Sequence, residues 1–325
     1  MFEIIPKISK IYRQIQKNIV KSIDRWKKGA KMENKITKFL AHNKRVAVMC
    51  LDTTELVEEI RKIHDLTPTT TATLGRVATV STMMAHLNLK EITDNLTIQI
   101  KGNGPIGTIV SVCELEDLRT AIIKICVDNS KVELPLKEDG KIDVGGAVGN
   151  NGYLNVIKEN ELTQGKYNGI IPLVSGEIAE DFTEFFVKSE QKPTALALGV
   201  LVNKDGVKRA GGYIINPLPD ATDEDISKIE QAISNSRPIS AMLDENLSLE
   251  EIAKIVTGDE NIEILKQDLQ VKYKCNCSRE KFERGIKSLG KEEVQKIIEE
   301  DGKIDTECNF CHKKYHFSKE DLENF

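Results

Sequence analysis

Four of the seven cysteines in this chain form two close pairs near its C-terminus. The pairs are Cys275-x-Cys277 and Cys308-x-x-Cys311, and both occur in polar, turn-forming stretches. Four thiolates carried on two turns can surround one Zn²⁺ ion tetrahedrally, with Zn–S distances of about 2.3 Å. The spacing therefore predicts a closed zinc site whose ligands are Cys275, Cys277, Cys308 and Cys311.

A closed four-thiolate site limits what the metal can do. No coordination position is left for water, so a structural or redox role is favoured over metal-assisted hydrolysis. The C-x-C pair holds its sulfurs closer together than an ordinary zinc ribbon does, and its oxidation would close a small, strained and therefore labile ring. His312 and His316 could replace one thiolate, although four cysteines already complete the tetrahedron. The cysteines alone leave open both a permanent zinc staple and a redox-active centre.

The segments before and between these cysteines contain both helix signals and strand signals. Between the two pairs, residues 289–300 predict a helix with an acidic exposed face. Upstream, residues 32–216 predict an α+β core domain, because strand signals first cluster and are then interrupted by helix signals. The predicted strands are 45–52, 96–101, 108–112, 120–127, 153–158, 167–174, 194–202 and 207–215. The predicted helices of this region are 54–66, 69–87 and 177–189.

Other candidate chemical motifs in the core domain are weak. Residues 102–107 match the dinucleotide fingerprint G-x-G-x-x-G, but a β-branched run follows instead of the required helix, so a β-hairpin turn is predicted. The glycines within 145–152 are interpreted as a flexible loop. Three histidines have no spacing typical of a metal site or proton relay: His42, His64 and His86. Three further thiols lie in apolar runs, as buried small hydrophobes do: Cys50, Cys113 and Cys126. Such thiols suit a reducing cytoplasm.

Residues 217–270 differ sharply in composition from the core. They contain thirteen acidic and four basic residues, and no aromatic residue occurs within 214–272. Capping boxes begin at Thr222 and Ser248, and Gly258 can end the second helix. Short, self-repelling helices without aromatic anchors are marginal alone and depend on neighbours. Because structural zinc contributes on the order of 10–16 kcal/mol to folding, loss of the metal could unfold this acidic helical linker.

The first 31 residues have a composition of their own. They carry nine Lys or Arg residues and two acidic residues, and isoleucines recur at helical spacing up to Trp26. Three interpretations of this basic N-terminal extension stay open. It could be an amphipathic helix on a membrane surface, a loosely ordered tail containing Pro6, or a segment preceding a true start at Met32.

Several motifs resemble one family. The matching segments are 102–107, 211–213, 237–243, 247–259, 275–280, 307–311 and 315–317. From about Met32 to Leu322 the chain therefore resembles the redox-regulated 33 kDa chaperonin family of bacterial heat-shock holdases. The resemblance implies an α+β core, a metastable helical linker and a small C-terminal zinc-binding domain over residues 271–325. It implies nothing about residues 1–31.

The resemblance also implies a mechanism. The reduced protein would be a monomer with one Zn²⁺ per chain. On oxidation, Cys275 would pair with Cys277 and Cys308 with Cys311, zinc would leave, and the linker would unfold. The oxidised homodimer would hold unfolding client proteins without ATP and protect them from aggregation under oxidative stress. The family is one of chaperones, so no enzymatic activity is expected.

The main alternative is a zinc-ribbon protein that binds nucleic acid or the ribosome. Residues 271–325 carry twelve basic and twelve acidic side chains, so they present no net positive charge to phosphates. The whole chain has a formal net charge of -5 and contains no stretch of about 20 apolar residues. Nucleic-acid and membrane partners are therefore not predicted.

Overall fold

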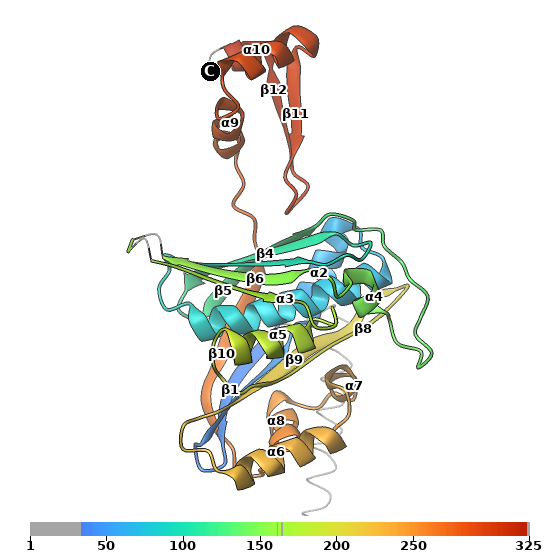
Figure 1. Ribbon diagram of the computed structural model, residues 1–325, viewed down its shortest axis with the longest axis vertical. Coiled ribbons are helices and arrows are strands. Elements are labelled where there is room, and N and C mark those ends of the chain that lie inside the picture. The colour runs from blue at the N-terminus through green and yellow to red at the C-terminus, as the bar shows by residue number, and fades with distance from the viewer. Residues whose placement is uncertain (1–33, 161, 164, 324–325) are drawn as a thin grey trace, which may run out of the picture. The chain divides into compact units, whose positions relative to one another are not determined.

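The computed structural model describes residues 34–160, 162–163 and 165–323 (Figure 1). The basic extension over residues 1–31, with the three hypotheses made for it, lies outside the described residues. The helices of the described part are α2 (Thr54–His64), α3 (Pro68–Asn88), α4 (Val144–Val148), α5 (Ala179–Lys188), α6 (Asp223–Asn235), α7 (Ile239–Asp244), α8 (Leu249–Thr257), α9 (Arg279–Lys287), α10 (Lys291–Glu300) and α11 (Lys319–Glu323).

The strands form one large mixed sheet and one small hairpin. Their bounds are β1 (Lys35–Ala41), β2 (Val46–Asp52), β3 (Asp94–Lys101), β4 (Thr108–Asp117), β5 (Thr120–Val127), β6 (Tyr153–Asn160), β7 (Lys166–Pro172), β8 (Ala195–Asn203), β9 (Gly206–Pro217), β10 (Glu263–Tyr273), β11 (Lys303–Glu307) and β12 (Lys314–Ser318). The order in the large sheet is β7-β6-β3-β4-β5-β10-β1-β2-β9-β8, and β11 pairs with β12. The predicted α+β class is confirmed.

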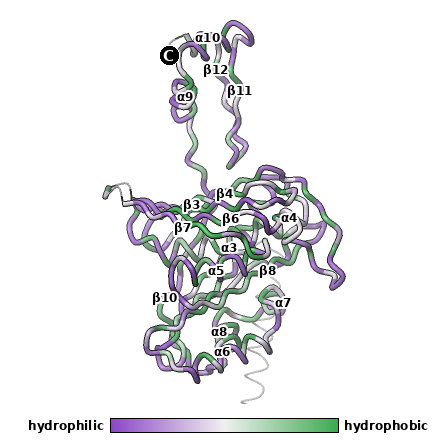
Figure 2. Tube along the Cα trace, in the orientation of Figure 1, coloured by the Kyte–Doolittle hydropathy of each residue, from purple (hydrophilic) through white to green (hydrophobic). Residues whose placement is uncertain are grey.

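Strand β10 joins the two halves of the large sheet. Its first part pairs antiparallel with β1, and its last residues, 270–273, pair in parallel with β5. Figure 1 shows α3 and α5 between these halves, and α3 contacts β4 and β5 on one side and β8 and β9 on the other. Nearly every residue of α3 is buried, as expected for a helix covered on all sides. The core of the protein therefore lies around α3, where Figure 2 shows hydrophobic segments in the neighbouring strands.

The threonines of α3 explain how so polar a helix can be buried. Thr71, Thr73 and Thr79 donate their hydroxyl groups to the carbonyl oxygen four residues earlier, at 2.7–2.9 Å. Each hydroxyl is thereby satisfied inside the helix, so its burial leaves no unpaired polar group.

Most of the core elements match their sequence predictions, but the glycine-rich stretch does not. The predicted hairpin at 102–107 is confirmed between β3 and β4. The loop predicted within 145–152 is wrong for residues 145–148, because they belong to α4 and pack against that hairpin. Gly104 N–H donates to the Val148 carbonyl at 2.8 Å, and a Cβ on Gly102 would lie 2.1 Å from the same oxygen. Gly102 and Gly104 therefore allow the backbone of the hairpin to pack closely against the backbone of α4.

The acidic linker residues form three helices on the outer face of β1, β2 and β9. Thr222 and Ser248 cap α6 and α8 in full capping boxes, and Gly258 ends α8 in the left-handed conformation, as predicted. The apolar faces of α6, α7 and α8 share a core with Phe39, Val48 and Tyr213. The helical part ends at Thr257, and Glu263–Tyr273 form strand β10, which the sequence analysis did not predict. The domain limits themselves stay predictions.

Candidate metal centre

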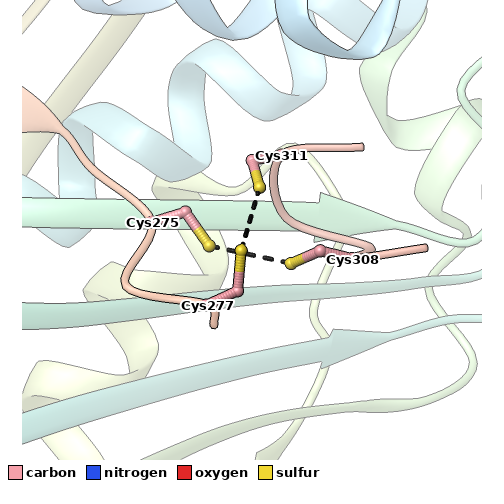
Figure 3. A group of neighbouring side chains, drawn as sticks. All are labelled: Cys275, Cys277, Cys308 and Cys311. Atoms are coloured by element: carbon pink, nitrogen blue, oxygen red, sulfur yellow. Dashed lines mark hydrogen bonds between the residues drawn. The ribbon is translucent and has the colours of Figure 1, made fainter. Parts of the chain in front are cut away.

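The four predicted cysteines come together in the structure (Figure 3). Cys275 and Cys277 follow directly after β10, while Cys308 and Cys311 lie in the turn between β11 and β12. In that turn, His312 N–H donates to the Cys308 carbonyl at 2.8 Å, and His312 adopts a φ of 58°. The backbone therefore turns tightly, and the sulfur atoms of Cys308 and Cys311 lie on the same side of the turn. Two short segments thus deliver all four thiols to one point.

The sulfur positions fit a tetrahedral metal ion. All four Sγ atoms lie within 4.8 Å of one another. Cys275 Sγ is 3.7 Å from Cys308 Sγ, and Cys277 Sγ is 3.4 Å from Cys311 Sγ. A tetrahedron with Zn–S bonds of about 2.3 Å has S–S edges of about 3.8 Å. The cluster could therefore hold one metal ion, and its all-thiolate composition fits Zn²⁺.

The two histidines considered as alternative ligands are engaged elsewhere. His312 Nδ1 lies 2.5 Å from Glu307 Oε1, and His316 Nδ1 lies 2.6 Å from Asp305 Oδ1. Within the described residues, the only group of cysteines, histidines and acidic side chains close enough to share a metal consists of the four cysteines. The geometry favours the all-cysteine ligand set.

Tyr315 supports the cluster from β12. Its hydroxyl group donates to Cys277 Sγ at 3.1 Å, and its ring stacks at 4.6 Å on Phe282 of α9. Burial opposes ionisation of Cys277, but the hydrogen bonds from Tyr315 and the neighbouring thiols lower its pKa to about 7. In the sequence, Tyr315 stands out only as part of a family motif.

Removing the Tyr315 hydroxyl group should weaken metal binding. We expect Tyr315→Phe to lower zinc affinity about tenfold, as is usual when a hydrogen bond to a metal ligand is lost. Competition with a chromophoric chelator at pH 7 measures the affinity. Tyr153→Phe is the matched control, since that tyrosine lies on β6 and makes no contact with the cluster. Equal affinities of Tyr315→Phe and the unmodified protein would contradict the expected role.

Hydrogen bonds connect the cysteine turns to the core strands. Lys274 N–H donates to the Ile123 carbonyl at 3.1 Å, which continues the β10–β5 pairing to the residue before Cys275. The Tyr273 hydroxyl group bonds to the carbonyl of Phe310, inside the second cysteine turn. His312 Nε2 lies 2.9 Å from His64 Nδ1 of α2. The metal centre is therefore linked to the same strand that joins the two halves of the sheet.

A second polar cluster fastens the linker helices to the core. We call it the linker clamp, and its members are His42, Arg45, Asp225 and Asp259. Arg45 donates two hydrogen bonds, of 2.7 and 2.8 Å, to the buried Asp225 carboxylate of α6. His42 N–H donates to Asp259 Oδ2 at 2.6 Å, just after α8. His42, Asn43 and Lys44 all have positive φ, which places the turn between β1 and β2 against both helices.

Only Asp225 of this clamp has a local sequence signal. It is the acidic residue of the capping box that begins at Thr222, and it accepts hydrogen bonds from Thr222 N–H and Oγ1. Its partner Arg45 lies 180 residues away in the chain and carries no local signal. His42, His64 and His86 are buried, and each has a hydrogen-bond partner.

The three remaining cysteines behave as predicted from their apolar surroundings. Cys50 and Cys113 are fully buried, and Cys126 is half-buried. Burial raises the pKa of Cys113 to about 12 and that of Cys126 to about 11. These thiols stay protonated at neutral pH, so their reactivity toward oxidants is low.

The fold and the cluster together define a mixed α/β protein with a cluster of four cysteines that could hold one metal ion. The family model described as "Hsp33 protein" matches residues 34–318. The chain therefore belongs to the Hsp33 family.

Individual relatives agree with this assignment. A 33 kDa chaperonin of Acetivibrio thermocellus is 46% identical over 292 residues, which cover 90% of this chain and 96% of the relative. A 33 kDa chaperonin of Bacillus subtilis is 42% identical over 289 residues, covering 89% and 96%. The crystal structure of the 33 kDa chaperonin of Thermotoga maritima matches with a TM-score of 0.79 at 35% identity, covering 90% of this chain and 97% of that one. All three are named chaperonins.

Proposed function

We propose that this protein is a redox-regulated, ATP-independent chaperone whose switch is the four-cysteine zinc centre. The observation that carries the proposal is the position of the cluster. Cys275 follows β10 by one residue, and β10 follows directly on the linker helices. A change at the cysteines can therefore act on the linker through one continuous segment. The family membership and the names of the relatives support the chaperone class.

In the reduced state, a zinc ion bound by Cys275, Cys277, Cys308 and Cys311 would hold the two cysteine turns together. The C-terminal segment has a small core of its own, made by Ile286, Val294, Ile298, Tyr315 and Phe317. A core of this size is too small to be stable alone, so the thiolate cluster supplies much of its stability. No described helix is long and apolar enough to cross a membrane. All seven cysteines are free thiols, and a reducing cytoplasm is the compartment that keeps thiols in this state.

Oxidation would remove the ligands. In the proposed reaction, Cys275 forms a disulfide with Cys277, and Cys308 forms one with Cys311. Each disulfide consumes two thiolates, one peroxide and two protons, and yields two molecules of water when the oxidant is hydrogen peroxide. A disulfide sulfur is a poor ligand, so the metal is released. The adjacent-pair assignment agrees with the family resemblance of the C-x-C and C-x-x-C motifs.

Release of the C-terminal segment would free β10 and then the linker helices. The faces of α6, α7 and α8 that now pack on the sheet are apolar, and include Ile229, Met242 and Ile252. Their undocking would also uncover Phe39 and Tyr213 of the sheet. Such surfaces bind the apolar segments of unfolded clients, and a second oxidised copy could cover part of them in a dimer.

The proposed function is tested by three measurements made on the same sample. Reduced, zinc-loaded protein is treated with hydrogen peroxide at raised temperature while zinc release, thiol loss and aggregation of a chemically denatured enzyme are followed. We expect four thiols to be lost, one zinc to be released and client aggregation to fall by about tenfold at equimolar chaperone. Cys126→Ala serves as a control that should respond like the unmodified protein.

Two outcomes would overturn the proposal. Zinc release and thiol loss without any change in client aggregation would leave a redox-active protein that is not a switchable chaperone. Equal suppression of aggregation by the reduced and oxidised forms would leave a chaperone without a redox switch.

A further inference from the structure

A cavity of about 850 Å³ opens beside the cysteine cluster. Except for Lys124, its lining residues lie between 275 and 310. The sulfur-bearing residues Cys275, Cys277 and Cys308 form part of its wall, whereas Cys311 does not. This volume is typical of sites for small organic molecules. The cavity therefore brings a small molecule next to three of the four cysteines.

The cavity wall is mainly apolar. Its large side chains come from α9, α10, β11 and the loops beside them, and are Phe282, Ile286, Leu289, Ile297, Ile304 and Phe310. Leu289 lies in the loop between α9 and α10, and its side chain is 54% exposed. This side chain is therefore available to contact a small molecule bound in the cavity. A wall of this kind favours an apolar molecule over a small, fully hydrated one.

The charges at the rim do not favour an ion. Lys303 forms an ion pair with Asp305 at 2.7 Å, and Lys124 forms one with Glu114 at 2.9 Å. Lys281 and Asp301, which also line the cavity, have opposite charges. With its charges balanced, the rim exerts no strong attraction on either an anion or a cation. A neutral guest is therefore the best match.

We propose that this cavity binds neutral organic hydroperoxides and presents them to the thiolates of Cys275, Cys277 and Cys308. This inference rests on the proposed redox switch and names the class of oxidant that the switch receives best. Thiolates are soft nucleophiles, and of the neutral apolar molecules that fit the cavity, a hydroperoxide carries the electrophilic oxygen with which they react. The apolar wall selects an apolar molecule, the balanced charges of the rim favour a neutral one, and the nearby sulfur atoms favour one that oxidises thiolates.

The proposed reaction consumes two thiolates, one hydroperoxide and two protons from water. A cysteine thiolate attacks the terminal oxygen of the hydroperoxide, the O–O bond breaks, and the alkoxide leaves as an alcohol after taking up a proton. The cysteine is then a sulfenic acid. A second thiolate attacks that sulfur, the S–O bond breaks, and hydroxide leaves as water after taking up the second proton. Two thiolates are oxidised to one disulfide, and one hydroperoxide is reduced to one alcohol and one water.

The test compares two peroxides on the full-length, zinc-loaded protein. Cumene hydroperoxide is apolar and hydrogen peroxide is not, so we expect cumene hydroperoxide to release zinc about tenfold faster at equal concentration. Zinc release and thiol loss are both measured as second-order rates. If neither peroxide releases zinc, the redox switch itself fails. If hydrogen peroxide acts and cumene hydroperoxide is no faster, only the cavity inference fails.

Gly285 allows the cavity to be narrowed without a clash. It lines the cavity within α9, and a Cβ built on it meets no atom within 4 Å. We expect Gly285→Leu to slow the cumene hydroperoxide reaction about tenfold and to leave the hydrogen peroxide rate within about twofold. Gly285→Ala is the matched control for the gain in helix propensity, and should change both rates little. Equal slowing of both peroxides by Gly285→Leu would overturn the inference.

Leu289→Asn is a second variant that should not disturb folding, because this side chain is largely exposed. It removes part of the apolar wall while leaving the cavity open. We expect it to slow cumene hydroperoxide several-fold and to leave the hydrogen peroxide rate unchanged. An unchanged cumene hydroperoxide rate in both Leu289→Asn and Gly285→Leu would show that the oxidant does not use this cavity.

Discussion

Replacement of both Cys275 and Cys277 by serine is expected to unfold the segment from α9 to β12 (residues 279–318) and leave the large sheet of the core intact. Two of the four proposed ligands are removed, so the site can no longer close around zinc. The segment then retains only its five buried apolar side chains. Loss of a structural zinc site costs about 10 kcal/mol, which exceeds what so small a core can supply.

Amide hydrogen exchange measures this effect region by region. The amides of β11 and β12 should lose their protection completely, while those of β3 and β4 should keep it. Cys126→Ala is the matched control, since it removes a thiol that lies outside the cluster. Protection of β11 and β12 that persists in the double variant would show that the segment folds without the metal.

Asp225→Ala is expected to detach the linker helices from the core without oxidation. The buried carboxylate accepts two hydrogen bonds from Arg45 and also caps the first turn of α6. Losing these charged hydrogen bonds together with the helix cap costs about 2 kcal/mol, which corresponds to a roughly thirtyfold larger equilibrium constant for local opening. The variant should therefore hold unfolded clients in its reduced, zinc-loaded form.

Exchange of the α6 and α8 amides, together with client aggregation, tests this expectation. Glu224→Ala is the matched control, because Glu224 neighbours Asp225 in α6 but its side chain is 76% exposed and pairs only with Lys228. It should alter neither measurement by more than about twofold. If Asp225→Ala opened the linker as expected but left client aggregation unchanged, linker release would not be the activating step.

The same contact predicts how the linker responds to acid. The hydrogen bonds from Arg45 are the largest cause that holds the pKa of Asp225 well below its usual range. Because the folded-state pKa is depressed, the stabilisation is present above the unfolded pKa of about 4 and is lost as the pH falls through the folded value. The linker should therefore stay docked to well below pH 4. Arg45→Gln should shift its acid release toward pH 4, as hydrogen exchange against pH would show.

Elements with a clear local pattern could be predicted from the sequence. Regular alternation identified β2 to β9, and capping boxes identified the starts of α6 and α8. Strand β10 escaped prediction because its first half is exposed and only Leu269 and Val271 are buried, so it lacks a strong periodic signal. The short strands β11 and β12 escaped for a related reason, since five residues carry too little pattern.

The candidate metal site was predictable because its chemistry depends on residue type and short spacing. Two pairs of cysteines on turns bring four sulfurs to one point almost regardless of what surrounds them, and the structure places all four within 4.8 Å. The apolar cavity beside them was not predictable. Its wall combines Phe282 of α9, Leu289 of the loop after α9 and Ile304 of β11, and only their packing creates the space.

The sequence by itself determined the mixed α/β class, the acidic helical linker and the four cysteines of the candidate metal centre, because periodicity, composition and close spacing are local properties of a chain. Only the tertiary structure decided that β10 joins the two halves of the sheet and ends two residues before Cys275, and that Arg45 reaches Asp225 across 180 residues. Contacts of this kind depend on the path of the whole backbone, and no local pattern encodes them.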